Sequence, residues 1–174
     1  MKGEPDAPVF LIGFMGAGKT TVGRILAQML GFHFVDLDEI VEANAGRSVL
    51  AIFAELGEDE FRRLEREALE NGRDMKQTVI ALGGGAFISK ENRAIIDQTG
   101  EAVWLDCPLE ICLGRIERDG SRPLLAGETE MKALLERRRP FYALADHTVS
   151  TGDCSAEEAA ARVFDLLNKR FRSG

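Results

Sequence analysis

The sequence predicts an α/β fold in which a parallel sheet of five strands is covered by helices on both faces. Short apolar runs alternate with longer stretches in which apolar residues recur every three or four positions, as expected for strands and amphipathic helices. The runs are apolar at almost every position, which is typical of strands that are buried on both faces. No repeat, low-complexity tract or linker divides the 174 residues, so we expect a single domain spanning residues 1–174.

The apolar segments define the elements in order along the chain. The strands are predicted at the short apolar runs, residues 9–12, 32–35, 78–82, 102–105 and 147–151. The helices are predicted where the apolar spacing becomes helical, at residues 22–30, 39–45, 49–56, 61–69, 89–97, from 108 onwards and from 155 onwards. Gly31 and Gly57 can end two of these helices, and Pro108 opens another. Ser155 and Glu158 have the spacing of a capping box, which opens the last helix.

Residues 13–20 read Gly-Phe-Met-Gly-Ala-Gly-Lys-Thr and match the phosphate-binding pattern G-x-x-x-x-G-K-[ST] between the first strand and the first helix. The glycines let backbone N–H groups surround a triphosphate, Lys19 reaches its outer phosphates, and the Thr20 hydroxyl can coordinate Mg²⁺. The N-terminus of the following helix adds a partial positive charge. We therefore expect a bound nucleoside triphosphate, held by residues Gly16, Ala17, Gly18, Lys19, Thr20 and Thr21.

Unusual residues also follow the second and third strands. Ligands of such sheets bind beyond the carboxyl ends of the strands, where Asp36 and Asp38 follow one strand and Gly83–Gly85 follow another. One carboxylate could hold Mg²⁺, directly or through water, while the other accepts a proton from an attacking hydroxyl. Asp38 could instead cap the helix after it, and the glycines could form only a tight turn.

The arginines provide candidate sites for an anionic substrate. Arg62 and Arg63 flank the apolar face of a predicted helix and could simply be solvated. Arg122 lies in a loop with glycine and proline that is long enough to move as a lid. Residues 137–139 are three arginines before Pro140, and they could instead complement the dipole at a helix C-terminus.

Composition limits the classes of partner. A net charge of −7 argues against a nucleic acid or an anionic membrane surface, because both require a basic footprint. No apolar run reaches the length of a membrane span, and the first eight residues lack a signal pattern. Three cysteines without a C-x-x-C pair indicate reduced thiols in a cytoplasmic protein rather than a metal site. From these residues alone we expect a Mg²⁺-dependent phosphotransferase or a nucleotide switch, and we expect a monomer.

Taken together, the motifs resemble the shikimate kinase family from about residue 9 to about residue 171. The segments that carry the resemblance are the loop 13–19, Asp36-x-Asp38, Gly57-Glu-x-x-Phe61-Arg62, Gly83–Gly85, Arg122-Pro-Leu-Leu125 and Arg138-x-Pro140-x-Tyr142. The resemblance implies a three-layer P-loop kinase fold with strand order 2-3-1-4-5, a substrate-binding region at about residues 37–66 and a mobile lid at about residues 115–128. It also implies transfer of a phosphoryl group from ATP to the 3-hydroxyl of shikimate.

The resemblance further implies roles for individual residues. Asp38 would orient the attacking hydroxyl, and Lys19 and Arg122 would stabilise charge on the transferred phosphoryl group. Thr20 would bind Mg²⁺, with Asp36 behind it through water, and Arg115 would lie against adenine. Arg62 and Arg138 would clamp the carboxylate of the substrate, and Asp38 would hold its hydroxyls. The backbone of Gly84 would contact the ring hydroxyls, with Gly83 and Gly85 beside it in the substrate site. A bidentate arginine fork suits a carboxylate better than lysine does.

One departure and two rival readings accompany the resemblance. Ala81 stands where some members place a serine near the metal-bound water, which leaves the second shell of the metal open. A regulatory GTPase is disfavoured because Asp97–Gly100 precedes a strand and no Asn-Lys-x-Asp guanine reader is present. The nearer alternative is another small-molecule P-loop kinase, such as a gluconate kinase.

Overall fold

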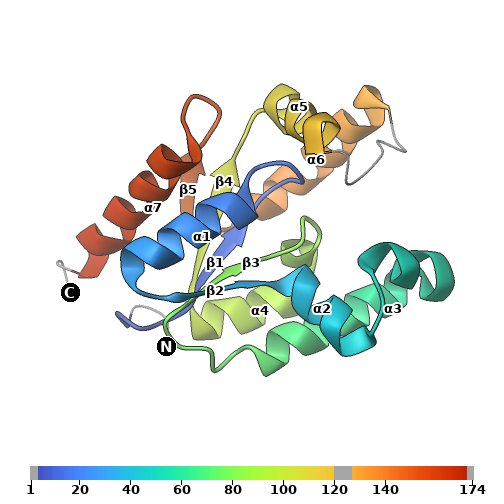
Figure 1. Cartoon of the computed structure of the whole chain (residues 1–174), viewed down its shortest axis with the longest axis horizontal. Coiled ribbons are helices and arrows are strands. Elements are labelled where there is room, and N and C mark those ends of the chain that lie inside the picture. Colours follow the sequence, from blue (N-terminus) through green and yellow to red (C-terminus); the bar gives the residue numbers. More distant parts are fainter. Residues whose placement is uncertain (1–3, 120–126, 172–174) are drawn as a thin grey trace.

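A computed structural model describes residues 4–119 and 127–171, and the described residues form a five-stranded sheet with helices on both faces (Figure 1). The strands are β1 (Val9–Ile12), β2 (His33–Asp36), β3 (Thr78–Ala81), β4 (Glu101–Asp106) and β5 (His147–Ser150). Their order in the described part of the chain is β2-β3-β1-β4-β5, and each neighbouring pair is parallel. The predicted fold class and the strand order are therefore confirmed.

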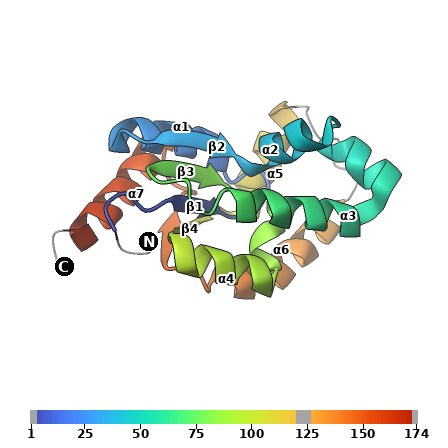
Figure 2. The same cartoon turned by 90° about the horizontal axis from the view of Figure 1, so that it is seen from below.

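The helices divide between the two faces of the sheet. They are α1 (Lys19–Leu30), α2 (Leu37–Ala45), α3 (Val49–Asn71), the short 3-10 helix η1 (Ala86–Ile88), α4 (Lys90–Thr99), α5 (Leu109–Asp119), α6 (Glu128–Tyr142) and α7 (Ala156–Phe171). Figures 1 and 2 show α1 beside α7 on one face, whereas α4 and α6 lie on the other. Both layers follow from amphipathic helices that bury one face against apolar strands.

Strand β1 separates two apolar cores. Its successive side chains point to opposite faces, so Phe10 and Ile12 join the core under α3, α4 and α6, while Val9 and Leu11 join the core under α1 and α7. All four side chains are at most 3% exposed. This double burial explains why the strand has no polar position, and it fixes the phosphate loop that follows at the carboxyl edge of the sheet.

Most of the predicted element boundaries are close to the observed ones. Each predicted strand lies within one residue of the observed bounds at either end. Gly31 adopts the left-handed conformation (φ 70°) at the end of α1, and Gly57 (φ 84°, ψ 172°) interrupts α3 at the predicted break. The capping box of α7 is present, because Ser155 N–H donates to Glu158 Oε2 and Glu158 N–H donates to Ser155 Oγ.

Two local features differ from the sequence-based expectation. The residue that caps α2 is Asp36, whose side chain accepts from Asp38 N–H, because α2 begins at Leu37 rather than at residue 39. The alternative role of Asp38 as the helix cap is therefore wrong. Pro140 lies inside the last turn of α6 rather than beyond its end. None of the helices within residues 4–119 and 127–171 is both long enough and apolar enough to cross a bilayer.

Candidate active site

The phosphate loop has the backbone that its sequence pattern predicts. Gly16 adopts φ 75° and packs so closely on α5 that a Cβ there would lie 2.5 Å from the carbonyl oxygen of Cys112. In the described part of the chain, no side chain caps the N-terminus of α1 at Gly18, so its N–H groups can receive a phosphate. Lys19 Nζ donates to the carbonyl oxygens of Gly13 and Phe14, each at 3.0 Å, and so lies across the loop.

Thr20 and Asp36 form the part of the site that suits a metal. The Thr20 hydroxyl donates to Asp36 Oδ2 at 2.9 Å, while Asp36 Oδ1 accepts from Asp38 N–H at 3.1 Å. These are oxygen donors, which Mg²⁺ prefers, but the described residues contain no cluster of three or more acidic, histidine or cysteine side chains that could cage an ion. Ala81 pairs with Asp36 across β3 and β2 and offers only a methyl group. The residues therefore fit a Mg²⁺ ion bound mainly through nucleotide phosphates and water.

Two carboxylates face the bare backbone of the glycine turn after β3. A Cβ at Gly83 would lie 2.9 Å from Asp38 Oδ1 and 3.1 Å from Glu65 Oε1. A side chain at Gly83 would therefore push against both carboxylates and shift at least that of Asp38. Burial raises the pKa of Glu65 above its ordinary value of 4.5, while the nearby Arg62 lowers it.

Arg62 and Arg138 lie on the next two glycines of the same turn. A Cβ at Gly85 would lie 2.7 Å from Arg62 Cζ, and a Cβ at Gly84 would lie 3.1 Å from Arg138 Nη1. Arg62 Nη1 donates to both oxygens of Glu65, at 3.1 and 2.9 Å, and the Glu65 side chain is fully buried. Nε and Nη1 of Arg138 are also buried, and no described residue accepts a hydrogen bond from either. This pair of guanidinium groups is built for a planar anion such as a carboxylate.

The three consecutive arginines of α6 have different environments. Arg138 faces the glycine turn, and its Cζ lies 6.0 Å from the ring centre of Phe14 in the phosphate loop. Arg139 Nη2 donates to Asp106 Oδ1 at 2.7 Å, at the end of β4. Arg137 is exposed at the rim of a cavity that it shares with Arg138. Arg139 lies in the last turn of α6, as the reading of helix-terminal charge expects, whereas Arg138 faces the glycine turn.

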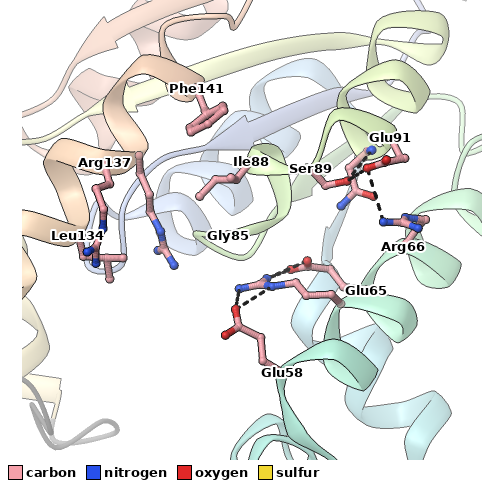
Figure 3. A pocket seen from close by; sticks show the side chains of 13 residues that line it. Glu58, Glu65, Arg66, Gly85, Ile88, Ser89, Glu91, Leu134, Arg137 and Phe141 are labelled. Atoms are coloured by element: carbon pink, nitrogen blue, oxygen red, sulfur yellow. Dashed lines mark hydrogen bonds and ion pairs between the residues drawn. The ribbon is translucent and has the colours of Figure 1, made fainter.

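The site spans two cavities on the carboxyl side of the sheet. A cavity of about 580 Å³ is lined by the phosphate loop together with Asp36, Asp38, Gly83, Gly84 and Arg115. Another of about 430 Å³ lies between α3, η1 and α6, and its lining includes Glu58, Arg62, Gly85, Leu134, Arg138 and Phe141. Figure 3 shows Glu58 and Glu65 of α3 across this second cavity from Leu134 and Arg137 of α6. Arg62 and Arg138 line the second cavity. Arg138 also packs against Gly84, which lines the first cavity, so the two cavities meet at the glycine turn.

Arg115 of α5 lies against the phosphate loop. Its Nη1 donates to the carbonyl oxygen of Gly16 at 3.3 Å and approaches Cys107 Sγ at 3.7 Å. The adjacent Cys112 thiol and the charge of Arg115 both lower the pKa of the Cys107 thiol. A further cavity of about 160 Å³ is lined by Arg115, Gly18 and Cys154. It offers space for a nucleotide base beside the Arg115 side chain. Arg122 and residues 120–126 of the predicted lid lie outside the described residues.

Glu65 and Tyr142 are among the residues of the site that were not assigned a role from the sequence. Glu65 follows Arg62 by three positions on α3, a spacing that places the two side chains on the same helix face, so the pair could have been found. Tyr142 Oη donates to the carbonyl oxygen of Gly84 at 2.6 Å. That contact joins residues far apart in sequence, and no local pattern predicts it.

Comparisons with known proteins agree with the geometry. The model of the shikimate kinase family matches residues 15–168. A shikimate kinase of Symbiobacterium thermophilum is 43% identical over 172 residues, which cover 95% of this chain and 99% of that protein. One from Caulobacter vibrioides is 46% identical over 164 residues, which cover 92% of this chain and 82% of that protein.

Solved structures show the same likeness. The structure of a shikimate kinase from Acinetobacter baumannii in complex with shikimate superimposes with a TM-score of 0.88 at 38% identity and covers 94% of this chain and 93% of that one. A shikimate kinase from Aquifex aeolicus gives a TM-score of 0.85 at 36% identity, covering 96% of this chain and 99% of that one. With a phosphate loop beside a glycine turn that carries two arginines, and with these similarities in sequence and structure, the chain belongs to the shikimate kinase family.

Proposed function

We propose that this chain transfers the γ-phosphoryl group of ATP to the 3-hydroxyl of shikimate, giving shikimate 3-phosphate and ADP. The observation that carries the proposal is the glycine turn after β3, where Arg62 and Arg138 lie on Gly85 and Gly84 and Asp38 lies on Gly83. The phosphate loop borders the same cavity as Asp38. A small hydroxylated acid can therefore place its carboxylate on the arginines and a hydroxyl beside Asp38, facing the nucleotide.

The reaction breaks the bond between the γ-phosphorus and its bridging oxygen and forms a bond from that phosphorus to the substrate oxygen. Asp38 orients the hydroxyl and accepts its proton as the new bond forms. Lys19 leaves the carbonyl oxygens of Gly13 and Phe14 to pair with the outer phosphates. Phosphoryl transfer requires mainly positioning and charge stabilisation from a protein, and these residues supply both.

Mg²⁺ is the cofactor that we assign to the site, bound with ATP by Thr20 directly and by Asp36 through water. The ion would neutralise phosphate charge and align the phosphates for transfer. Thr20 is already held by Asp36, so the hydroxyl oxygen keeps a lone pair for the ion while its hydrogen is engaged. The oxygen donors around Asp36 and Thr20 support this assignment.

The remaining assignments rest on the family. We infer that Gly16, Ala17, Gly18 and Thr21 also contact ATP, that Arg115 lies against adenine and that Arg122 reaches the phosphates from a lid at residues 115–128. We further infer a single domain whose region 37–66 binds substrate. We also infer a monomeric, cytoplasmic enzyme without nucleic-acid or membrane partners, which suits the acidic composition and the free thiols.

An assay of ADP release tests the proposed function. The purified protein would be supplied with ATP, Mg²⁺ and shikimate, gluconate or a nucleoside monophosphate in parallel. We expect ADP release that depends on shikimate, with the other substrates at background. Turnover with gluconate but not with shikimate would contradict the assignment, and omission of Mg²⁺ should abolish the signal.

A further inference from the structure

The guanidinium group of Arg62 is held by two glutamates in contrasting environments. Nη1 donates to both oxygens of Glu65, whereas Nε and Nη2 donate to Oε1 of Glu58 at 3.4 and 3.2 Å. The Glu65 side chain is fully buried, but the Glu58 side chain is 65% exposed. Dashed lines in Figure 3 mark these contacts on one side of the cavity.

The contacts with Glu58 cover the edge of Arg62 that a ligand would use. An arginine binds a carboxylate in bidentate fashion through two parallel N–H groups, and the Nε–Nη2 edge offers such a pair. Because Nη1 is already engaged by the buried Glu65, a carboxylate that enters the cavity meets the Nε–Nη2 edge with Glu58 on it.

We propose that Glu58 is an internal competitor of the substrate, whose carboxylate must leave Arg62 before the carboxylate of shikimate can bind there. The inference rests on the proposed function, in which Arg62 holds the substrate carboxylate. A protein whose binding-competent state is only partly populated shows an affinity reduced by that fraction. Glu58 thus weakens the apparent affinity for the substrate without taking part in phosphoryl transfer.

The two glutamates differ in how easily they can leave. Glu58 follows Gly57, whose left-handed backbone breaks α3, and its exposed carboxylate can be hydrated by water when it swings away. An exposed ion pair four residues apart on a helix contributes little to stability. Glu65 by contrast would remain as a buried charge without its partner, which is strongly unfavourable. The incoming carboxylate therefore displaces Glu58 and leaves Glu65 in place.

The test measures shikimate binding in Glu58→Gln, with Glu60→Gln as a matched control. Both changes remove one negative charge from the same turn of α3, but Glu60 pairs with Arg63 at 2.8 Å rather than with Arg62. By calorimetry we expect Glu58→Gln to lower the shikimate Kd about two- to fivefold, in line with an exposed pair. The shikimate KM should fall by the same factor with kcat unchanged, and Glu60→Gln should match the wild type in both measurements.

A second comparison shows whether the effect passes through Arg62. In an Arg62→Ala background, adding Glu58→Gln should give no further gain, because nothing remains to compete for. An unchanged or raised Kd in Glu58→Gln would overturn the proposal, since Glu58 would then be inert or would orient Arg62 for the substrate. A gain that persists without Arg62 would overturn it as well. If the wild type itself neither binds nor phosphorylates shikimate, the proposed function has failed. That result comes from the wild type alone, so it is distinguished from a failure of the Glu58 proposal, which needs the variants.

Discussion

The hydroxyl group of Tyr142 donates a 2.6 Å hydrogen bond to the carbonyl oxygen of Gly84, and so ties helix α6 to the glycine turn after β3. Arg138 lies one helical turn before Tyr142, on the same face of α6, and its Nη1 packs on Gly84 itself. This hydrogen bond therefore connects the backbone of the glycine turn to the helix that carries Arg138, the residue that we propose binds the substrate carboxylate.

Tyr142→Phe tests this relationship. The change keeps the ring, whose centre lies 5.9 Å from that of Trp104, but removes the hydroxyl that holds Gly84. We expect the free energy of unfolding to fall by about 0.5–1.5 kcal/mol, the net contribution of one hydrogen bond. Urea unfolding measures this loss. In steady-state kinetics the shikimate KM should rise while the ATP KM stays constant. An unchanged shikimate KM would show that α6 is held without this bond.

Arg62→Ala should weaken shikimate binding by about 2–5 kcal/mol, the usual cost of truncating a desolvated charge partner. ATP affinity should change little. Arg63→Ala is the matched control, because Arg63 is the next residue of α3 but pairs with the half-buried Glu60 and the exposed Glu67. Arg62→Lys should also be impaired, since a point charge cannot replace the planar fork. Calorimetry of the variants decides the matter, and equal losses in Arg62→Ala and Arg63→Ala would contradict a specific role for Arg62.

Much of the fold was predictable because its signals are local. The all-apolar strands, the phosphate loop and the break at Gly57 each depend on a few consecutive residues, and the observed structure reproduces them. The cap of α2 was missed because the choice between Asp36 and Asp38 depends on a two-residue shift in where the helix starts. The orientation of Arg138 depends on tertiary contacts between α6 and the glycine turn. These segments are far apart in the sequence, so no local spacing predicts how they meet.

Lys19→Met should abolish turnover while the protein remains folded. Lys19 Nζ donates to the backbone carbonyl oxygens of Gly13 and Phe14, and Lys19 belongs to neither apolar core, so its replacement should leave both cores intact. Circular dichroism should show the wild-type spectrum, and ADP release should fall to background. Residual activity near the wild-type level in the folded variant would remove Lys19 from the catalytic residues.

The raised pKa of Glu65 predicts a pH-dependent part of the stability. Burial raises this pKa, Asp38 adds to the effect, and Arg62 and Arg138 oppose it. The folded protein then binds the proton more tightly than the unfolded chain does, so the contribution of Glu65 to stability falls as pH rises from its unfolded pKa through the raised folded value. The glutamine of Glu65→Gln does not titrate, so this variant lacks the pH-dependent contribution and serves as the reference. The stability of the wild type relative to Glu65→Gln, measured by urea unfolding, should therefore decrease as the pH rises above the ordinary glutamate pKa of 4.5. A difference that grows with pH would show that pairing with Arg62 outweighs burial.

Substitutions of Asp38 and Asp36 should differ in their effects on kcat and on the Mg²⁺ requirement. Asp38→Asn keeps the size and an acceptor oxygen but loses the charge that draws a proton from the attacking hydroxyl, so kcat should fall by roughly 10²–10⁴-fold. The Mg²⁺ requirement of this variant should stay near that of the wild type.

Asp36→Asn can still cap α2, because asparagine caps as well as aspartate, but it weakens the hold on Thr20 and on the water shell of the ion. Its Mg²⁺ requirement should therefore rise. Mg²⁺ titrations of both variants at saturating ATP and shikimate measure the two effects side by side. Because Asp36 rather than Asp38 caps the helix, a loss of kcat in Asp38→Asn cannot be ascribed to a lost cap, and wild-type turnover there would exclude Asp38 as the base.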